Sequence, residues 1–101
     1  MDSMKNKIVH LIRDDIKIAR LIIGLKRLDI SAYKYHLGSA KVIFSLMGIP
    51  DDERNTDMYY RLIDEGGDLS KYDTSDKVEA LAERIFEQLS EYNSTSNNYV
   101  Q

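Results

Sequence analysis

Hydrophobic positions in the first third of the chain repeat with the period of an α-helix. Residues 8–28 read IVHLIRDDIKIARLIIGLKRL, with no proline and one internal glycine, Gly24. At about 100° per residue, the apolar side chains cover most of the helix circumference rather than a narrow stripe. Such a helix must be covered on several sides, so the sequence predicts a central helix over residues 4–28.

A second helix is predicted over residues 32–47, with its apolar side chains on one face. Asp29 or Ser31 can cap its start. Gly48 supplies a left-handed stop, and Pro50 prevents continuation. Because the connection to the first helix is short, the two helices should form an antiparallel hairpin.

Two more helices are predicted in the second half of the chain. The third starts within residues 50–53, whose acidic side chains suit the positive end of a helix dipole, and it ends at residues 66–67. The fourth spans residues 75–92, with a cap at Thr74, Ser75 or Asp76 and an apolar stripe opposite a row of glutamates. Residues 93–101 are polar and are predicted to be a disordered tail.

The predicted fold is therefore all-α, because no segment shows the period-two alternation of a strand. We expect a small four-helix bundle with a central hydrophobic N-terminal helix and a helix 1–2 antiparallel hairpin. Residues 1–92 should form a single helical domain, because a chain of 101 residues has room for one thin core.

Composition places the chain among globular, water-soluble proteins, with 43% hydrophobic and 31% charged residues. The chain contains no cysteine, which excludes disulfides and thiolate metal sites and fits a reducing compartment. The start, MDSMKNK, lacks the pattern of a secretory signal, and apolar runs are too short for a membrane span. We expect a cytoplasmic protein with no membrane contact.

Charge is distributed unevenly between the two halves of the chain. Residues 1–50 hold nine Lys/Arg and four Asp/Glu, a net charge of +5, whereas residues 51–101 hold five and thirteen, a net charge of −8. The halves should attract each other within one subunit or head to tail between subunits. Alternatively, the C-terminal helices carry solvated acidic faces.

Four residues stand out as buried polar or interface candidates: Asp15, His36, Tyr33 and Tyr59. Asp15 falls inside the apolar arc of the first helix, where an ionised carboxylate needs a partner. It is either a ligand, proton donor or specificity device, or a structural carboxylate bonded to a Tyr, Lys or Arg of another helix. His36 lies on the apolar face of the second helix, as a metal ligand, a titrating switch or a packed ring. The tyrosines are suited to a contact surface or to the ends of the bundle.

A basic strip follows the first helix through Arg13, Lys17, Arg20 and Arg27. Regularly spaced cations can contact nucleic-acid phosphates, so nucleic-acid binding is one alternative function. The acidic net charge and the absence of a helix-turn-helix or zinc signature argue against it. The other interpretation is a face that is solvated or paired with the acidic fourth helix.

No motif for catalysis or cofactor binding is present. There is no glycine-rich phosphate loop, nucleophile-elbow serine or HExxH sequence, so we predict a non-enzyme without cofactor. His10 and Asp14 are spaced to share a metal ion, but two ligands make a weak site, and we assign no metal-binding residue. A metal or small-ligand bundle built on Asp15, His36 and the tyrosines is a further alternative.

The leading expectation is a non-enzymatic interaction or oligomerisation module, a scaffold or adaptor for an unidentified protein partner. It rests on the first helix, whose apolar arc is wide for three modest helices to cover. A homodimer sealed through that helix, or through the hairpin, would supply the missing cover.

Overall fold

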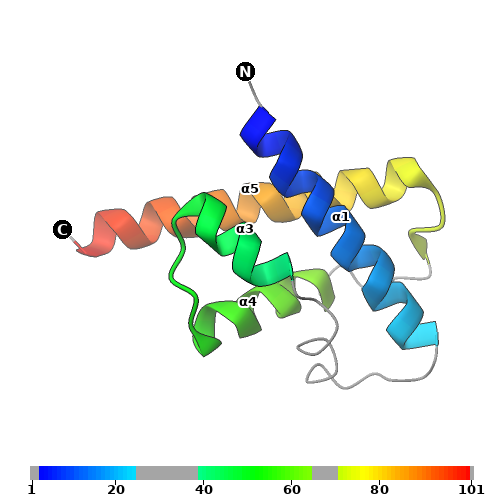
Figure 1. Ribbon diagram of the computed structural model, residues 1–101, viewed down its shortest axis with the longest axis horizontal. Helices are drawn as coiled ribbons and strands as arrows, with labels where there is room; N and C mark the ends of the chain where they lie inside the picture. The colour runs from blue at the N-terminus through cyan, green and yellow to red at the C-terminus, as the bar shows by residue number, and fades with distance from the viewer. Residues whose placement is uncertain (1–2, 25–38, 65–70, 101) are drawn as a thin grey trace.

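Four helices make up the described part of the computed structural model (Figure 1). They are α1 (Ser3–Gly24), α3 (Ser39–Met47), α4 (Glu53–Asp64) and α5 (Ser75–Val100). The structure describes residues 3–24, 39–64 and 71–100, and these ranges contain no strand. α1 packs against both α3 and α5. The all-α prediction and the central place of the first helix in a small bundle are confirmed.

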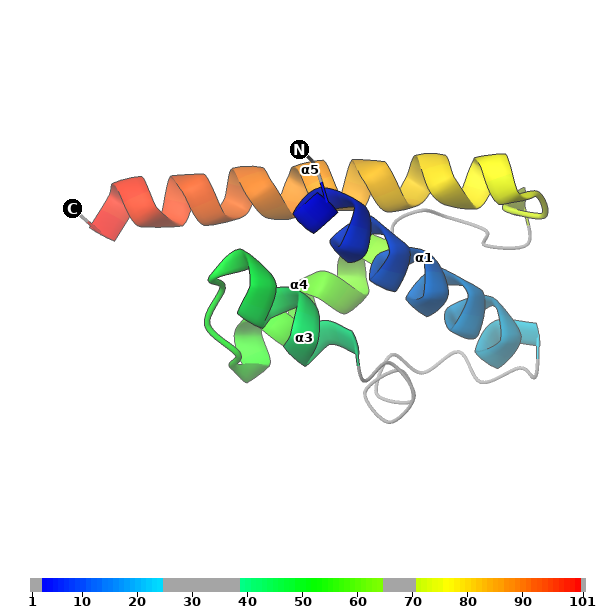
Figure 2. The ribbon, with the colours of Figure 1, turned by 45° about the horizontal axis from the view of Figure 1, so that its top comes forward.

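The helices are arranged around α1 and α5, which cross obliquely (Figure 2). α3 runs roughly opposite to α1 and packs against it, as the hairpin prediction requires, although residues 25–38, which connect them, lie outside the described residues. α4 packs against α5 and lies below it in the view of Figure 2. The two longest described helices therefore form the frame on which the shorter pair is placed.

One hydrophobic core takes side chains from all four helices. The α1 contribution follows helical spacing through Ile8, Ile12, Ile16 and Ala19, each at most 2% exposed. The α5 contribution is the predicted stripe: Val78, Leu81, Ala82, Ile85 and Leu89. Burying each large aliphatic side chain contributes roughly 1.5–3 kcal/mol, so the apolar contact between α1 and α5 dominates the stabilisation of the fold.

The structure corrects the premise behind the homodimer prediction. Within one chain, the apolar residues of α1 from Ile8 to Ala19 are buried or packed against the core. Only Met4 and Leu21 are exposed among the large apolar side chains described on this helix. α3 and α5 cover α1 on two sides, so a second subunit is not needed to shield residues 8–19.

Side-chain caps fix where two of the helices begin. The Asp52 carboxylate accepts a hydrogen bond from the backbone N–H of Asn55 at 2.8 Å, so Asp52 is the N-cap of α4. The helix thus starts at Glu53, at the end of the predicted starting segment. Thr74, one of three predicted caps, accepts the N–H of Lys77 at 3.3 Å and marks the start of α5.

α3 ends in the way that the sequence predicts. Gly48 has a φ of 72°, which is the left-handed conformation that favours glycine. The N–H of Ile49 donates to the carbonyl of Phe44 at 2.9 Å, and that of Gly48 to Ser45 at 3.4 Å. This pair of hydrogen bonds is a Schellman motif, and buried Ile49 supplies its usual hydrophobic contact.

The predicted disordered tail is instead helical as far as Val100, so α5 continues eight residues past the expected end at Tyr92. The side-chain amide of Asn93 donates to the carbonyl of Met47 at 2.8 Å, which fastens α5 to the end of α3. Because residues 93–100 contain no glycine or proline, nothing in the local sequence stops the helix once it is anchored there.

Replacing Gly48 tests the role of the left-handed stop. A Cβ atom at this position would meet nothing within 4 Å, so the cost comes from the backbone alone. Gly48→Ala should lower the free energy of unfolding by about 1–2 kcal/mol in urea denaturation. Gly48→Asn is the control and should cost less, because asparagine tolerates this conformation. Equal stability of the alanine variant and the wild type would contradict the assignment.

Candidate functional site

The most unusual polar group in the core is the carboxylate of Asp15 on α1. Asp15 is fully buried, and the hydroxyl of Tyr59 on α4 donates to its Oδ2 atom at 2.6 Å. Tyr59 is also fully buried. The structure thus brings together two of the four predicted buried polar residues. The partner of Asp15 is a tyrosine of another helix, one of the residue types expected if Asp15 is a structural carboxylate. Tyr33 and His36 lie outside the described residues.

Aromatic rings surround the phenol of Tyr59. The ring of Phe44 lies edge-on to it, with 6.0 Å between centroids and an interplanar angle of 79°. The ring of Tyr60 lies 5.9 Å away. Edge-on packing of this kind is favourable for aromatic quadrupoles and fixes the orientation of the hydroxyl. α3 and α4 therefore aim the Tyr59 hydroxyl at the α1 carboxylate.

Burial shifts the pKa of both partners. Desolvation raises the pKa of Asp15 to about 6, against the lowering effect of the hydrogen bond from Tyr59 and of the nearby Ser39 hydroxyl. The Oδ1 atom of Asp15 is buried and has no hydrogen-bond partner among the described residues. Burial and then the Asp15 charge raise the pKa of Tyr59 well above 10. At neutral pH the Tyr59 phenol donates a hydrogen bond to the Asp15 carboxylate. This hydrogen bond replaces only part of the hydration that the carboxylate would have in water.

A second polar cluster joins the α3–α4 turn to α5. The side chain of Asn55 is almost fully buried and donates to the carbonyl of Pro50 at 2.8 Å. Its Oδ1 atom accepts the hydroxyl of Tyr92 at 2.6 Å. Sequence reasoning missed this residue. The available signal was its position four residues before Tyr59, on the buried side of α4.

The predicted basic strip is partly neutralised by the acidic half of the same chain. Arg13 forms a 2.8 Å ion pair with Glu79 of α5 and also contacts the Nδ1 atom of His10. Both side chains of the ion pair are about one-third exposed, so its contribution is modest. At the other end of the same interface, the ammonium of Lys5 lies 5.6 Å from the centre of the Phe86 ring. At the Arg13–Glu79 contact, the basic and acidic halves therefore attract each other within one subunit.

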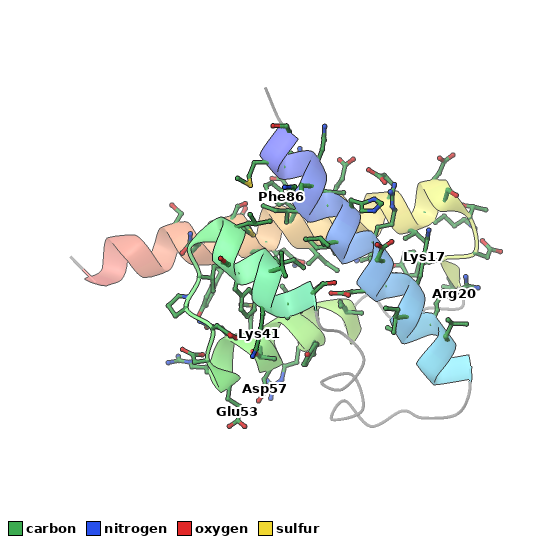
Figure 3. All side chains as sticks on the ribbon, viewed as in Figure 1. Lys17, Arg20, Lys41, Glu53, Asp57 and Phe86 are labelled. Carbon is green, nitrogen blue, oxygen red and sulfur yellow. The ribbon has the colours of Figure 1, made fainter. Side chains whose placement is uncertain are left out.

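The rest of the strip follows the same side of α1. Lys17 and Arg20 project from α1 on the side of the N-terminal end of α5 (Figure 3). Lys17 is exposed. The pKa of Asp73 is lowered mainly by Lys77, and the Arg20 charge adds a smaller effect. Arg27 lies outside the described residues.

The predicted His10–Asp14 pair is present, with 3.6 Å between Nε2 and Oδ2. Among residues 3–24, 39–64 and 71–100, no group of three or more His, Cys, Asp or Glu side chains is placed to hold a metal ion. The metal-bundle alternative would also have used His36, whose position is not described.

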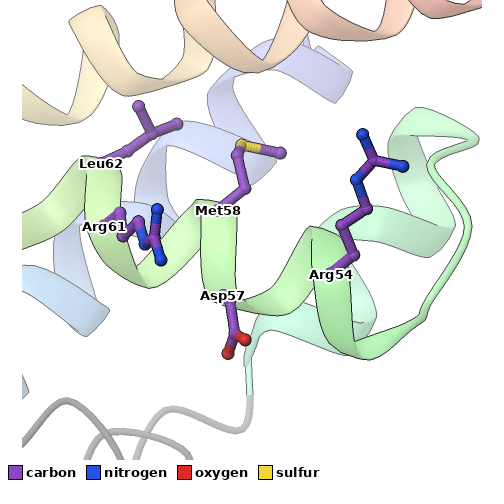
Figure 4. A pocket seen from close by; sticks show the side chains of 5 residues that line it. All are labelled: Arg54, Asp57, Met58, Arg61 and Leu62. Carbon is purple, nitrogen blue, oxygen red and sulfur yellow. The ribbon is translucent and has the colours of Figure 1, made fainter.

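A surface pocket of about 430 Å³ lies along α4 (Figure 4). Its described lining residues are Arg54, Asp57, Met58, Arg61 and Leu62. In the view of Figure 4, the side chains of Arg54, Met58 and Leu62 point to one side of the helix and Asp57 to the other. Met58 and Leu62 belong to the modest apolar face that the sequence gives this helix, but the sequence did not single out Arg54 and Arg61, because arginines beside such a face resemble an ordinary helix surface.

Comparisons of the chain with models of protein families, with curated proteins and with solved structures found no match. Among the described helices, none combines the length and the apolar content that crossing a membrane requires. The functional argument therefore rests on the geometry of the chain itself.

Asp15→Asn tests the raised pKa. The unfolded carboxyl titrates near 3.8 and the folded one near 6, so the folded state binds more protons between these values. Stability gained from protonated Asp15 is thus present below pH 4 and is lost as the pH rises through 6. The free energy of unfolding of Asp15→Asn relative to wild type should increase by on the order of 2 kcal/mol from pH 4 to pH 7. A difference that does not change with pH would contradict the burial of this carboxyl.

Tyr59→Phe tests the hydrogen bond itself. Removal of the hydroxyl leaves a buried carboxylate without its donor, so the free energy of unfolding should fall by about 1–3 kcal/mol at pH 7. The loss should be smaller at pH 4, where Asp15 is protonated. The control is the same substitution in the Asp15→Asn background, measured as a double-mutant cycle. An equal loss in both backgrounds would show that the two side chains are not coupled.

Proposed function

We propose that the chain is a non-enzymatic helical interaction module, a self-associating scaffold or adaptor for a protein partner. The observation that carries the proposal is where its exposed large apolar side chains lie. Among the described residues they are Met4 and Leu21 on α1 and Val42 on α3, at 51%, 69% and 49% exposure. They lie on the pair of helices that we expected to seal a homodimer, and a second copy covering them would bury apolar surface.

The burial of the Asp15–Tyr59 pair supports a role other than catalysis. Both side chains are 0% exposed, so a substrate in solution has no contact with the carboxylate or the phenol. Their hydrogen bond joins α1 to α4 across the core. A pair held in this way serves to position helices, and it leaves the outer faces of those helices for recognition.

The alternatives draw less support from the structure. Nucleic-acid binding through the basic strip would require Arg13 to give up its ion pair with Glu79. Retention of the protein on heparin or DNA at low salt, lost as salt rises, would favour that function. A cytoplasmic location remains part of the proposal, and it is supported by a chain without cysteine.

Sedimentation tests self-association. Between micromolar and millimolar concentration, the weight-average mass should rise from that of one 11.7 kDa chain toward twice that value. Leu21→Glu should keep the protein monomeric, because it places a charge in the proposed contact. Gln88→Glu adds the same charge at an exposed position of α5 and is the matched control. A monomer at every concentration, or equal effects of both variants, would contradict a homodimer sealed through α1 and α3.

A further inference from the structure

The side of α4 that carries Met58 and Leu62 is built differently from the exposed surface of α1 and α3. Met58 and Leu62 are half-buried and pack against the core, so their inner atoms are fixed while their outer atoms remain in contact with solvent. They are four residues apart and therefore follow one another along the same side of the helix. The pocket beside them has a volume of about 430 Å³, enough for one large aliphatic side chain with room around it.

Two exposed arginines line the same pocket as this apolar pair. Arg54 and Arg61 are seven residues apart, a rise of about 10.5 Å along the helix. Within the described residues, no ion pair engages either guanidinium. Asp57 belongs to the same helix, but its side chain points to the opposite side in Figure 4. The described lining of the pocket thus combines an apolar pair with two guanidinium groups and one carboxylate, in a protein whose net charge is −3.

We propose that this face of α4 binds an acidic amphipathic helix of a protein partner. The inference rests on the proposed function, because it assumes that the chain is a protein-binding module. An aliphatic side chain of the partner occupies the pocket beside Met58 and Leu62. Carboxylates about two turns apart on the partner lie opposite Arg54 and Arg61, in the geometry of a helix placed along a groove. This complementarity sets the choice and orientation of the partner more than the affinity.

A phosphate backbone fits the same face less well. Two cations would neutralise only two phosphates, so the affinity for a nucleic acid would depend only weakly on salt. The phosphates would also cover the apolar surface of Met58 and Leu62 without burying it against an apolar group. An acidic helix satisfies the arginines and covers that apolar surface in one contact. The charge and the apolar pair together therefore favour a protein helix.

The test uses fluorescence anisotropy with two labelled peptides. Each is an alanine-based helix of about 20 residues, long enough to be partly helical in water, with two leucines four residues apart. One peptide carries glutamates seven residues apart beside the leucines, and the other carries lysines there. The protein variants are Arg54→Glu with Arg61→Glu and, as a control with the same total charge change, Lys17→Glu with Arg84→Glu, both at exposed positions.

The glutamate peptide should bind the wild type saturably, and salt should weaken the binding. The Arg54→Glu/Arg61→Glu variant should lose at least about tenfold in affinity for it and should prefer the lysine peptide. The Lys17→Glu/Arg84→Glu control should bind the glutamate peptide within about twofold of wild type, because rim charges away from the contact act only through long-range steering. Circular dichroism of each variant confirms that the helices are intact.

Three outcomes would overturn the inference. They are failure of the glutamate peptide to bind, equal binding of the two peptides, and equal loss of affinity in both double variants. Binding of a labelled DNA duplex that the Arg54→Glu/Arg61→Glu variant loses would also overturn it, in favour of a nucleic-acid face. If the same wild-type sample self-associates through Leu21 but does not bind the glutamate peptide, this inference fails and the interaction module stands. If it is monomeric and binds neither peptide, both fail.

Discussion

The hydrogen bond between Tyr59 and Asp15 is the constraint around which the described helices are arranged. A carboxylate in the middle of an apolar helix face is tolerated only when another element supplies a donor. Tyr59 can reach it only if α4 lies against α1, with Phe44 of α3 packed on its ring. The bond therefore specifies one packing of three helices, whereas apolar contacts alone would allow several.

This specificity has an energetic cost at neutral pH. The raised pKa of Asp15 means that the ionised form is less favourable in the folded state than in water, and within the described part of the chain Oδ1 has no hydrogen-bond partner. The apolar cluster around it offsets this cost, since most of its members are almost completely buried. The chain thus combines a costly polar group inside with the surfaces that we propose for recognition outside, namely exposed Leu21 on α1 and the arginines of α4.

Much of the fold could be predicted from the sequence, because helix signals are local. The end of α3 at Gly48 and the buried stripe of α5 follow from residue type and spacing. The angular position of Asp15 was enough to place it in the core and to require a partner. The choice of Tyr59 among seven tyrosines was not available, since it depends on how α4 packs against α1.

The predictions that failed depended on tertiary contacts. The helix past Tyr92 is fastened by a hydrogen bond from Asn93 to the end of α3, forty-six residues away in sequence. The cover over α1 depends on how α3 and α5 pack around it, which the width of an apolar arc does not reveal. A role for Arg54 and Arg61 could not be predicted from the sequence, because it depends on the pocket that they line with two apolar side chains in the structure.

The pKa of Asp15, measured by NMR from the pH dependence of its side-chain carboxyl carbon shift, tests the account most directly. Burial beside Tyr59 predicts a titration midpoint of about 6. A midpoint near 3.8, the value for a solvated aspartate, would show that the carboxylate is in water and that α1 and α4 do not meet as described.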